Sequence, residues 1–181
     1  MLCTANICRS AMTEALLSAR LATLGVPIPV QSAGMTAAAA PPPPEAAAAL
    51  AARGHDISAH RGRTARAADL TGADLIVGMT REHVRHAVVL APGAWPRTFT
   101  LKELVRRGQQ IGPRMPGEPL SGWLDRAGHG RDHRDLLGRS AADDIADPYG
   151  GPAHEYELTA DLLDQLTGDL ADLCWGLSPY G

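Results

Sequence analysis

Hydrophobic residues recur at helical spacing near both ends of the chain. Positions 10–24 carry methionine and leucine every three or four residues and end at Gly25, which predicts an amphipathic helix. A similar pattern over positions 155–175 predicts a long C-terminal helix. Its expected apolar stripe comprises Leu158, Leu162, Leu166, Leu170 and Leu173.

Short apolar runs and further helical patterns alternate between these two helices. Strands are expected at 28–31, 75–77 and 98–101. Helices are expected at 44–53, 81–90, 102–107, 120–137 and briefly near Ala67, with a Gly- and Pro-rich loop at 108–119. Strands that alternate with helices predict an α/β fold, in which helices cover both faces of a parallel sheet.

Composition limits the possible function classes. At 181 residues the chain is long enough for a substantial core, and we expect one domain spanning residues 1–181. A net charge of −3 gives no electrostatic reason to expect nucleic-acid binding, and no apolar run approaches the length of a membrane span. Three cysteines, an odd number, suit a reducing compartment, so a cytoplasmic protein is expected.

The chemistry is predicted by the stretch from Cys3 to Ser10 that opens the first helix. A five-residue loop between Cys3 and Arg9 can turn its backbone N–H groups inward as an anion-binding nest. The helix N-terminus adds free N–H groups, and Arg9 can hold two phosphate oxygens. The same field favours a thiolate at Cys3, and Ser10 can donate to its sulfur. The phosphate-binding residues expected here are Thr4, Ala5, Asn6, Ile7, Cys8 and Ser10.

With Asn6-Ile7-Cys8 inside the loop and Asp147-Pro148-Tyr149 far downstream, the sequence resembles the low-molecular-weight protein tyrosine phosphatases. The resemblance implies a single-domain three-layer sandwich, with about four parallel strands between helices. It implies a protein-tyrosine-phosphatase that hydrolyses aryl phosphate esters through a cysteinyl-phosphate intermediate, without cofactor or metal. Its partners would be phosphotyrosine-containing proteins, with a cognate tyrosine kinase as a further partner, and the enzyme would be a monomer.

The same resemblance suggests roles for individual residues. Cys3 would be the nucleophile, Arg9 the phosphate clamp and Asp147 the general acid and base. Pro148 keeps Asp147 out of a helix, as a loop-borne acid requires. Tyr149 would line the slot for the phenyl ring. The alanines at 37–40, where the family's opposite wall is bulkier, predict a wider mouth.

Supporting roles are expected around Asn6, a residue type that tolerates the left-handed backbone region. The resemblance implies that Ser32 and His60 brace it. Asp143 and Asp144 match no position of the family's motif, and they are expected only to solvate their loop.

Two other functions stay open. A thiol-dependent arsenate reductase could use the same loop, although Cys174 alone lies downstream and argues against a disulfide relay. A phosphate-binding module without catalysis would lack the nucleophile or the acid. Cys174 is expected in the core, and the histidine pairs 83/86 and 129/133 have no convincing third ligand, so no metal site is predicted.

The start of the sequence raises a separate expectation. Only Met1 and Leu2 precede Cys3, whereas the family's loop follows a strand of about five or more apolar residues, a normal strand length. The first strand should therefore be truncated, leaving the neighbouring strands with unpaired backbone groups. Apolar residues encoded upstream would restore the strand.

Overall fold

A four-stranded parallel sheet forms the centre of the computed structural model, which describes residues 1–36 and 39–176. The strands, in the spatial order β2-β1-β3-β4, are β1 (Leu2–Cys3), β2 (Ala33–Gly34), β3 (Ile76–Gly78) and β4 (Thr98–Thr100). Leu2 pairs with Ala33 on one side and with Gly78 on the other. The predicted parallel α/β fold is confirmed.

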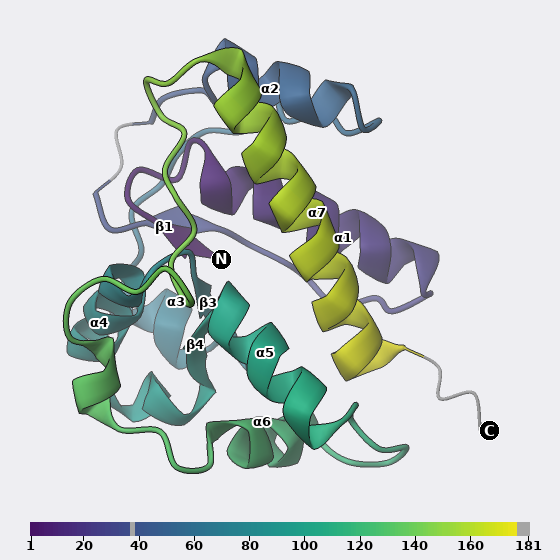
Figure 1. Cartoon of the computed structure of the whole chain (residues 1–181), viewed down its shortest axis with the longest axis vertical. Coiled ribbons are helices and arrows are strands. Elements are labelled where there is room, and N and C mark those ends of the chain that lie inside the picture. The colour runs from purple at the N-terminus through teal and green to yellow at the C-terminus, as the bar shows by residue number, and fades with distance from the viewer. Residues whose placement is uncertain (37–38, 177–181) are drawn as a thin grey trace.

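Helices cover both faces of this sheet (Figure 1). They are α1 (Arg9–Thr23), α2 (Pro44–Ala51), α3 (Ala67–Thr71), α4 (Arg81–Leu90), α5 (Leu101–Ile111), α6 (Leu120–Gly128) and α7 (Ala153–Trp175), with short 3-10 turns η1 (Pro92–Arg97) and η2 (His133–Leu136). Successive strand residues point to opposite faces. Val77 and Phe99 therefore pack with α1, α5 and α7, whereas Leu2 and Ile76 pack with residues of α3 and α4.

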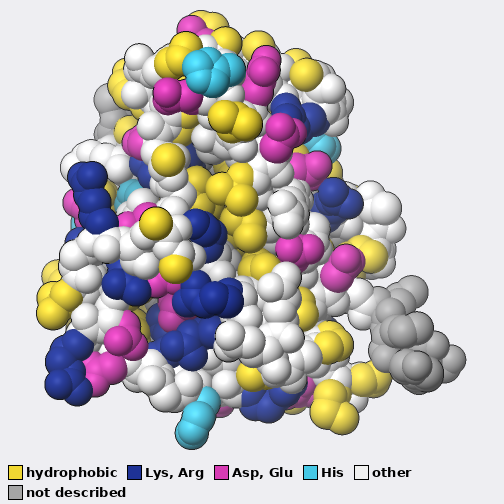
Figure 2. Space-filling view, viewed as in Figure 1, with side chains coloured by type: hydrophobic (Ala, Val, Ile, Leu, Met, Phe, Trp, Pro, Cys, Tyr) yellow, Lys and Arg dark blue, Asp and Glu magenta, His cyan; other side chains and the backbone are white. Residues whose placement is uncertain are grey.

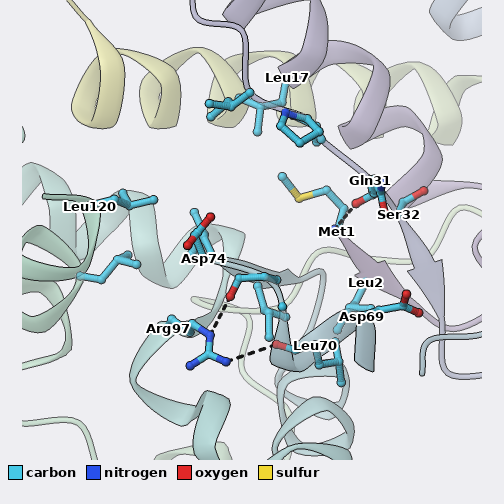
Figure 3. Close-up of a pocket in the computed structure, with 18 of the residues that line it drawn as sticks. Met1, Leu2, Leu17, Gln31, Ser32, Asp69, Leu70, Asp74, Arg97 and Leu120 are labelled. Atoms are coloured by element: carbon cyan, nitrogen blue, oxygen red, sulfur yellow. Dashed lines mark hydrogen bonds between the residues drawn. The ribbon is translucent and has the colours of Figure 1, made fainter. Parts of the chain in front are cut away.

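The central strand β1 is short, as expected, yet it pairs on both sides. The amino group of Met1 donates to the carbonyl of Gln31 at 2.6 Å, and the N–H of Met79 donates to the carbonyl of Leu2 at 3.0 Å. A cavity of about 940 Å³ lies beside Met1 (Figure 3). Its lining includes Leu17 and Leu120 but no residue from 3 to 10, so this cavity is separate from the predicted phosphate loop.

The strand predicted at 28–31 is wrong, because pairing with β1 begins only at Ala33. Pro27 and Pro29 have no N–H group, so they cannot donate to a ladder. The helix predicted at 102–107 extends from Leu101 to Ile111. Gly108 therefore lies inside this helix and not in the predicted loop at 108–119. A side chain at Gly108 would approach Trp123 and Leu173 to 2.8 Å, so the glycine permits close helix packing.

Two further expectations need correction. The helix predicted at 120–137 ends at Gly128, and Gly130 at φ 73° turns the chain away before η2. In α7 the buried face includes Leu163 and Leu170, whereas Leu158 is 64% exposed and does not belong to the stripe. Across the described residues, no helix combines the length and the apolar character that a membrane crossing requires.

Candidate active site

The predicted phosphate loop connects the end of β1 to the start of α1. Cys3 is buried, and its Sγ lies 2.9 Å from the Oγ of Ser10 and accepts a hydrogen bond of 3.2 Å from the N–H of Asn6. Among the described side chains none caps the N-terminus of α1, which begins after Cys8. The N–H groups of its first turn are therefore available to an anion beside Cys3.

Asn6 holds the shape of this loop. It is the one non-glycine residue in the described chain with a positive φ, at 57°. Its Nδ2 donates to Ser10 at 2.9 Å and to Ser32 at 2.7 Å. Its Oδ1 accepts from the N–H of Arg63 at 3.0 Å, and its carbonyl is hydrogen-bonded to His60 at 2.6 Å. Ser32 and His60, singled out in the sequence, thus both contact Asn6.

Gly34 brings the end of β2 against the same loop. A Cβ at this position would lie 2.7 Å from the carbonyl oxygen of Thr4 and 3.0 Å from the nitrogen of Asn6. Both neighbours are backbone atoms, so they could not swing aside as a flexible side chain could. The next residues, Met35 and Thr36, donate to the carbonyls of Cys3 and Thr4. Sequence reasoning missed Gly34, whose need for close approach is visible only in three dimensions.

Arg9 connects the loop to the segment that carries Asp147. Its side chain is buried; one terminal nitrogen donates to the carbonyl of Ile145 at 3.0 Å, and the other donates to Asp147 Oδ2 at 2.5 Å. The buried Nε of Arg9 has no hydrogen-bond partner among the described residues. Such an orphan donor is costly unless a ligand completes it. The guanidinium therefore has a free donor for an anion.

The mouth of the site is predicted to include Tyr149 and the alanines at 37–40. Tyr149 is 64% exposed, and its N–H donates to Asp147 Oδ1 at 3.4 Å. Its ring is thus accessible beside the carboxylate. The wider mouth expected from the alanines at 37–40 cannot be placed as a whole, because positions 37 and 38 lie outside the described residues.

A buried histidine that sequence reasoning considered only as a metal ligand supports the loop from α4. His83 is 1% exposed, with Nε2 3.2 Å from Thr4 Oγ1 and Nδ1 2.8 Å from Thr80 Oγ1. Burial, and then the charge of Arg9, lower the pKa of His83 to about 3. The imidazole is therefore neutral at pH 7, so one ring nitrogen can donate while the other accepts.

The expectation that Asp143 and Asp144 only solvate their loop is wrong. Asp143 is 5% exposed and accepts hydrogen bonds from Arg81 and Arg106, while Asp144 accepts from the backbone N–H of Arg81 at 2.8 Å. Burial by itself raises the pKa of Asp143, but the hydrogen bonds from Arg106 and Arg81 bring it below its ordinary value. Both carboxylates are anchors, not solvated side chains.

The other two cysteines are buried thiols. Burial raises the pKa of Cys8 to about 12, and burial does the same for Cys174. Cys174 is in the core, as predicted. The described residues include no group of three or more side chains that could hold a metal ion. Cys3 is thus the cysteine placed for nucleophilic chemistry, with hydrogen-bond donors facing its sulfur.

Together these groups suit a tetrahedral oxyanion. Sulfur lies at the base of the loop, helix N–H groups and the guanidinium of Arg9 supply positive potential, and the carboxyl group of Asp147 is paired with that guanidinium. A nucleophile, an anion clamp and a proton-transfer group are the parts that displacement at phosphorus requires.

Comparisons with known proteins agree with this geometry. The family model "Low molecular weight phosphotyrosine protein phosphatase" matches residues 1–112. A protein-arginine-phosphatase of Geobacillus stearothermophilus is 30% identical over 94% of this chain and 90% of its own length. The low molecular weight protein-tyrosine-phosphatase Etp of Escherichia coli K12 is 31% identical over 69% of this chain and 85% of its own. The crystal structure of a low molecular weight protein tyrosine phosphatase from T. tengcongensis superimposes with a TM-score of 0.71, at 32% identity, covering 94% of this chain and 95% of that chain.

Proposed function

The chain is a phosphatase that belongs to the low-molecular-weight phosphotyrosine protein phosphatase family, and we propose that it hydrolyses phosphotyrosine in proteins through a cysteinyl-phosphate intermediate on Cys3. The observation that carries the proposal is the unpartnered, buried Nε of Arg9 beside a loop whose donors face the sulfur of Cys3. A phosphate dianion supplies the acceptors that these donors lack.

Substrate binding frees the acid. Before binding, the carboxylate of Asp147 is paired with Arg9. A phosphate dianion competes for the same guanidinium, and it has the higher charge. Asp147 can then turn toward the leaving oxygen and take up a proton from solvent, which makes it the acid of the first step. Tyr149 provides an aromatic surface for the phenyl ring.

In the first chemical step, the thiolate of Cys3 attacks phosphorus and the bond between phosphorus and the phenolic oxygen breaks. The electron pair of that bond goes to the phenolic oxygen, which takes the proton of the carboxylic acid of Asp147. Arg9 and the loop N–H groups stabilise the equatorial oxygens as charge is redistributed.

In the second step, water attacks phosphorus and the thiolate of Cys3 leaves. The carboxylate of Asp147 accepts the proton of that water, so one side chain acts first as acid and then as base. The products are tyrosine and inorganic phosphate. When phosphate leaves, Asp147 returns its proton to solvent and pairs with Arg9 again. Ser10, whose Oγ lies 2.9 Å from the sulfur, can stabilise the departing thiolate.

The test uses Cys3→Ser with an aryl phosphate and no added metal. Turnover should be abolished, while inorganic phosphate should still bind, because Arg9 and the helix N-terminus are unchanged. Asp147→Ala should slow hydrolysis most for phenols that are poor leaving groups, since these need the proton most. Full activity in Cys3→Ser would refute the nucleophile assignment.

Phosphoarginine is the second candidate substrate. The relative that shares the longer aligned region with this chain is named a protein-arginine-phosphatase, whereas the one named a tyrosine phosphatase aligns over 69% of it. Values of kcat/KM for one peptide carrying either phosphotyrosine or phosphoarginine would separate the two. A higher value for the phosphoarginine peptide would overturn the choice of substrate but leave the Cys3 mechanism in place.

A further inference from the structure

The segment that carries Asp147 contains neither helix nor strand from position 137 to position 152, although a general acid needs a fixed place. In Figure 1 it is the light green stretch that leads from η2 to the start of α7. Its position must therefore come from side-chain and backbone contacts with the rest of the fold. Those contacts concentrate four residues before the acid, at Asp143.

Asp143 joins two helices to this segment. The Nε and one terminal nitrogen of Arg81, at the start of α4, donate to Asp143 Oδ2 at 2.8 and 2.6 Å. Arg106, in α5, donates to Asp143 Oδ1 at 2.7 Å and also to the carbonyl of Ala142 at 3.2 Å. Figure 2 shows basic side chains gathered beside acidic ones on the face where α5 begins.

The flanking residues extend the same attachment. Asp144 accepts from the N–H groups of Arg81 and Ser140, and Lys102 donates to the carbonyl of Ala141. The N–H of Ile145 donates to the carbonyl of Met79 at 2.8 Å, directly after β3. The chain is thereby held on both sides of Asp143 before it reaches Arg9 and Asp147.

The charges make Asp143 the central contact. A carboxylate that accepts from two guanidinium groups is a strong, directional acceptor, and removing it would leave both guanidinium groups without a carboxylate partner. The carboxylate is 5% exposed, so water could replace it only after local rearrangement. Removing the carboxylate would therefore displace the short connection from 144 to 147, which carries the acid.

We propose that Asp143, clamped between Arg81 and Arg106, is a positioning residue that aims the carboxyl group of Asp147 at the leaving oxygen. The inference rests on the proposed function, since it acts through Asp147 as general acid. Asp143 is not a catalytic residue, because its contacts are with Arg81 and Arg106. Its effect should therefore appear in proton transfer and not in phosphate binding.

The test is a double-mutant cycle of Asp143→Asn and Asp147→Ala, read with phenyl phosphate and p-nitrophenyl phosphate. Asp143→Asn alone should lower kcat/KM, which reports the steps up to departure of the phenol, by about 10- to 100-fold for phenyl phosphate, since a misplacement of about 1 Å can cost about 100-fold. For p-nitrophenyl phosphate, whose leaving group needs less protonation, the fall should be under about threefold. In the Asp147→Ala background, Asp143→Asn should change kcat/KM by less than about twofold, because its route of action is gone.

Two further variants control the cycle. Arg106→Gln removes one arm of the clamp and leaves both contacts of Arg81 in place, so it should show the same pattern with a smaller loss. Arg106→Gln takes the place of Asp143→Asn in the double-mutant cycle if Asp143→Asn does not fold. Asp132→Asn removes an exposed partner of Arg134 and should leave both substrates unaffected. Vanadate inhibition should be unchanged in Asp143→Asn, Arg106→Gln and Asp132→Asn, since the phosphate loop is intact.

An equal fall in kcat/KM for both substrates, or an equal effect of Asp143→Asn with and without Asp147, would overturn the positioning role and leave the proposed function standing. If Asp147→Ala itself did not slow phenyl phosphate hydrolysis, the acid assignment would be wrong and the positioning role with it. The two failures are thus distinguishable within one set of measurements.

Discussion

The neutral form of His83 should make the stability of this protein depend on pH. Folding lowers the pKa of His83 from its ordinary value of 6.5 to about 3, through burial and then the charge of Arg9. The unfolded chain therefore binds a proton at a pH where the folded chain does not. The contribution of His83 to the free energy of unfolding is complete above its pKa in the unfolded chain. It is lost as pH falls toward its pKa in the folded chain.

The magnitude follows from these two pKa values. Between pH 7.5 and pH 5 the unfolded state gains about 2 kcal/mol from protonation of this histidine, while the folded state gains almost nothing. The free energy of unfolding should fall by that amount, and Tm by about 4–8 °C for a chain of this size. The amino group of Met1, whose pKa burial lowers to about 6, adds a slope of the same sign.

The assay is urea unfolding at a series of pH values for the wild type and for His83→Gln. The glutamine keeps a polar group in reach of Thr4 but does not titrate. The fall in the free energy of unfolding between pH 7.5 and pH 5 should therefore be about 2 kcal/mol smaller in this variant than in the wild type. Met1 is the same in both proteins and cancels. His129→Gln, at an exposed position, should keep the full wild-type dependence. If the free energy of unfolding changed equally with pH in the wild type and in His83→Gln, the burial argument would be refuted.

Three further changes test how the loop and the sheet are held. Gly34→Ala should weaken vanadate binding by about 10-fold or more, since its Cβ would displace the carbonyl of Thr4; Gly93→Ala, with no heavy atom within 4 Å, should not. Asn6→Ala should lower the free energy of unfolding by about 3 kcal/mol, measured in urea, because three side-chain hydrogen bonds are lost and alanine must adopt φ 57°. Four apolar residues fused before Met1 should raise Tm by filling the neighbouring cavity, whereas a Gly-Ser extension of equal length should not.

The geometry of the loop from Cys3 to Ser10 was predictable because its atoms come from contiguous residues. One cysteine, a short loop, one arginine and a helix frame the proposed anion site, and each follows from local chemistry. The helix α1 was likewise predictable, because Met12, Leu16, Leu17 and Leu21 recur at helical spacing and are buried.

The remaining features depend on tertiary contacts. The helix α5 continues through Gly108 because Trp123 and Leu173 occupy the space that a side chain would need. The buried face of α7 excludes Leu158, because the position of α1 and α5 against α7 decides which leucines are covered. Asp143 looked like a solvated acid because Arg81 and Arg106 are distant in the sequence and reach it only through the fold.

These contacts explain why an eight-residue motif can predict a phosphatase but not how well it works. The loop from Cys3 to Ser10 is held by Ser32 and His60 through Asn6, by Gly34 through close approach, and by His83 through Thr4. These supports come from β2 and the residue before it, from the loop that carries His60, and from α4. Since a transition state discriminates displacements of well under 1 Å, the rate depends on these supports as much as on the sulfur and the guanidinium. Among substitutions outside the motif, those of Gly34, His83 and Asp143 should therefore change the rate first.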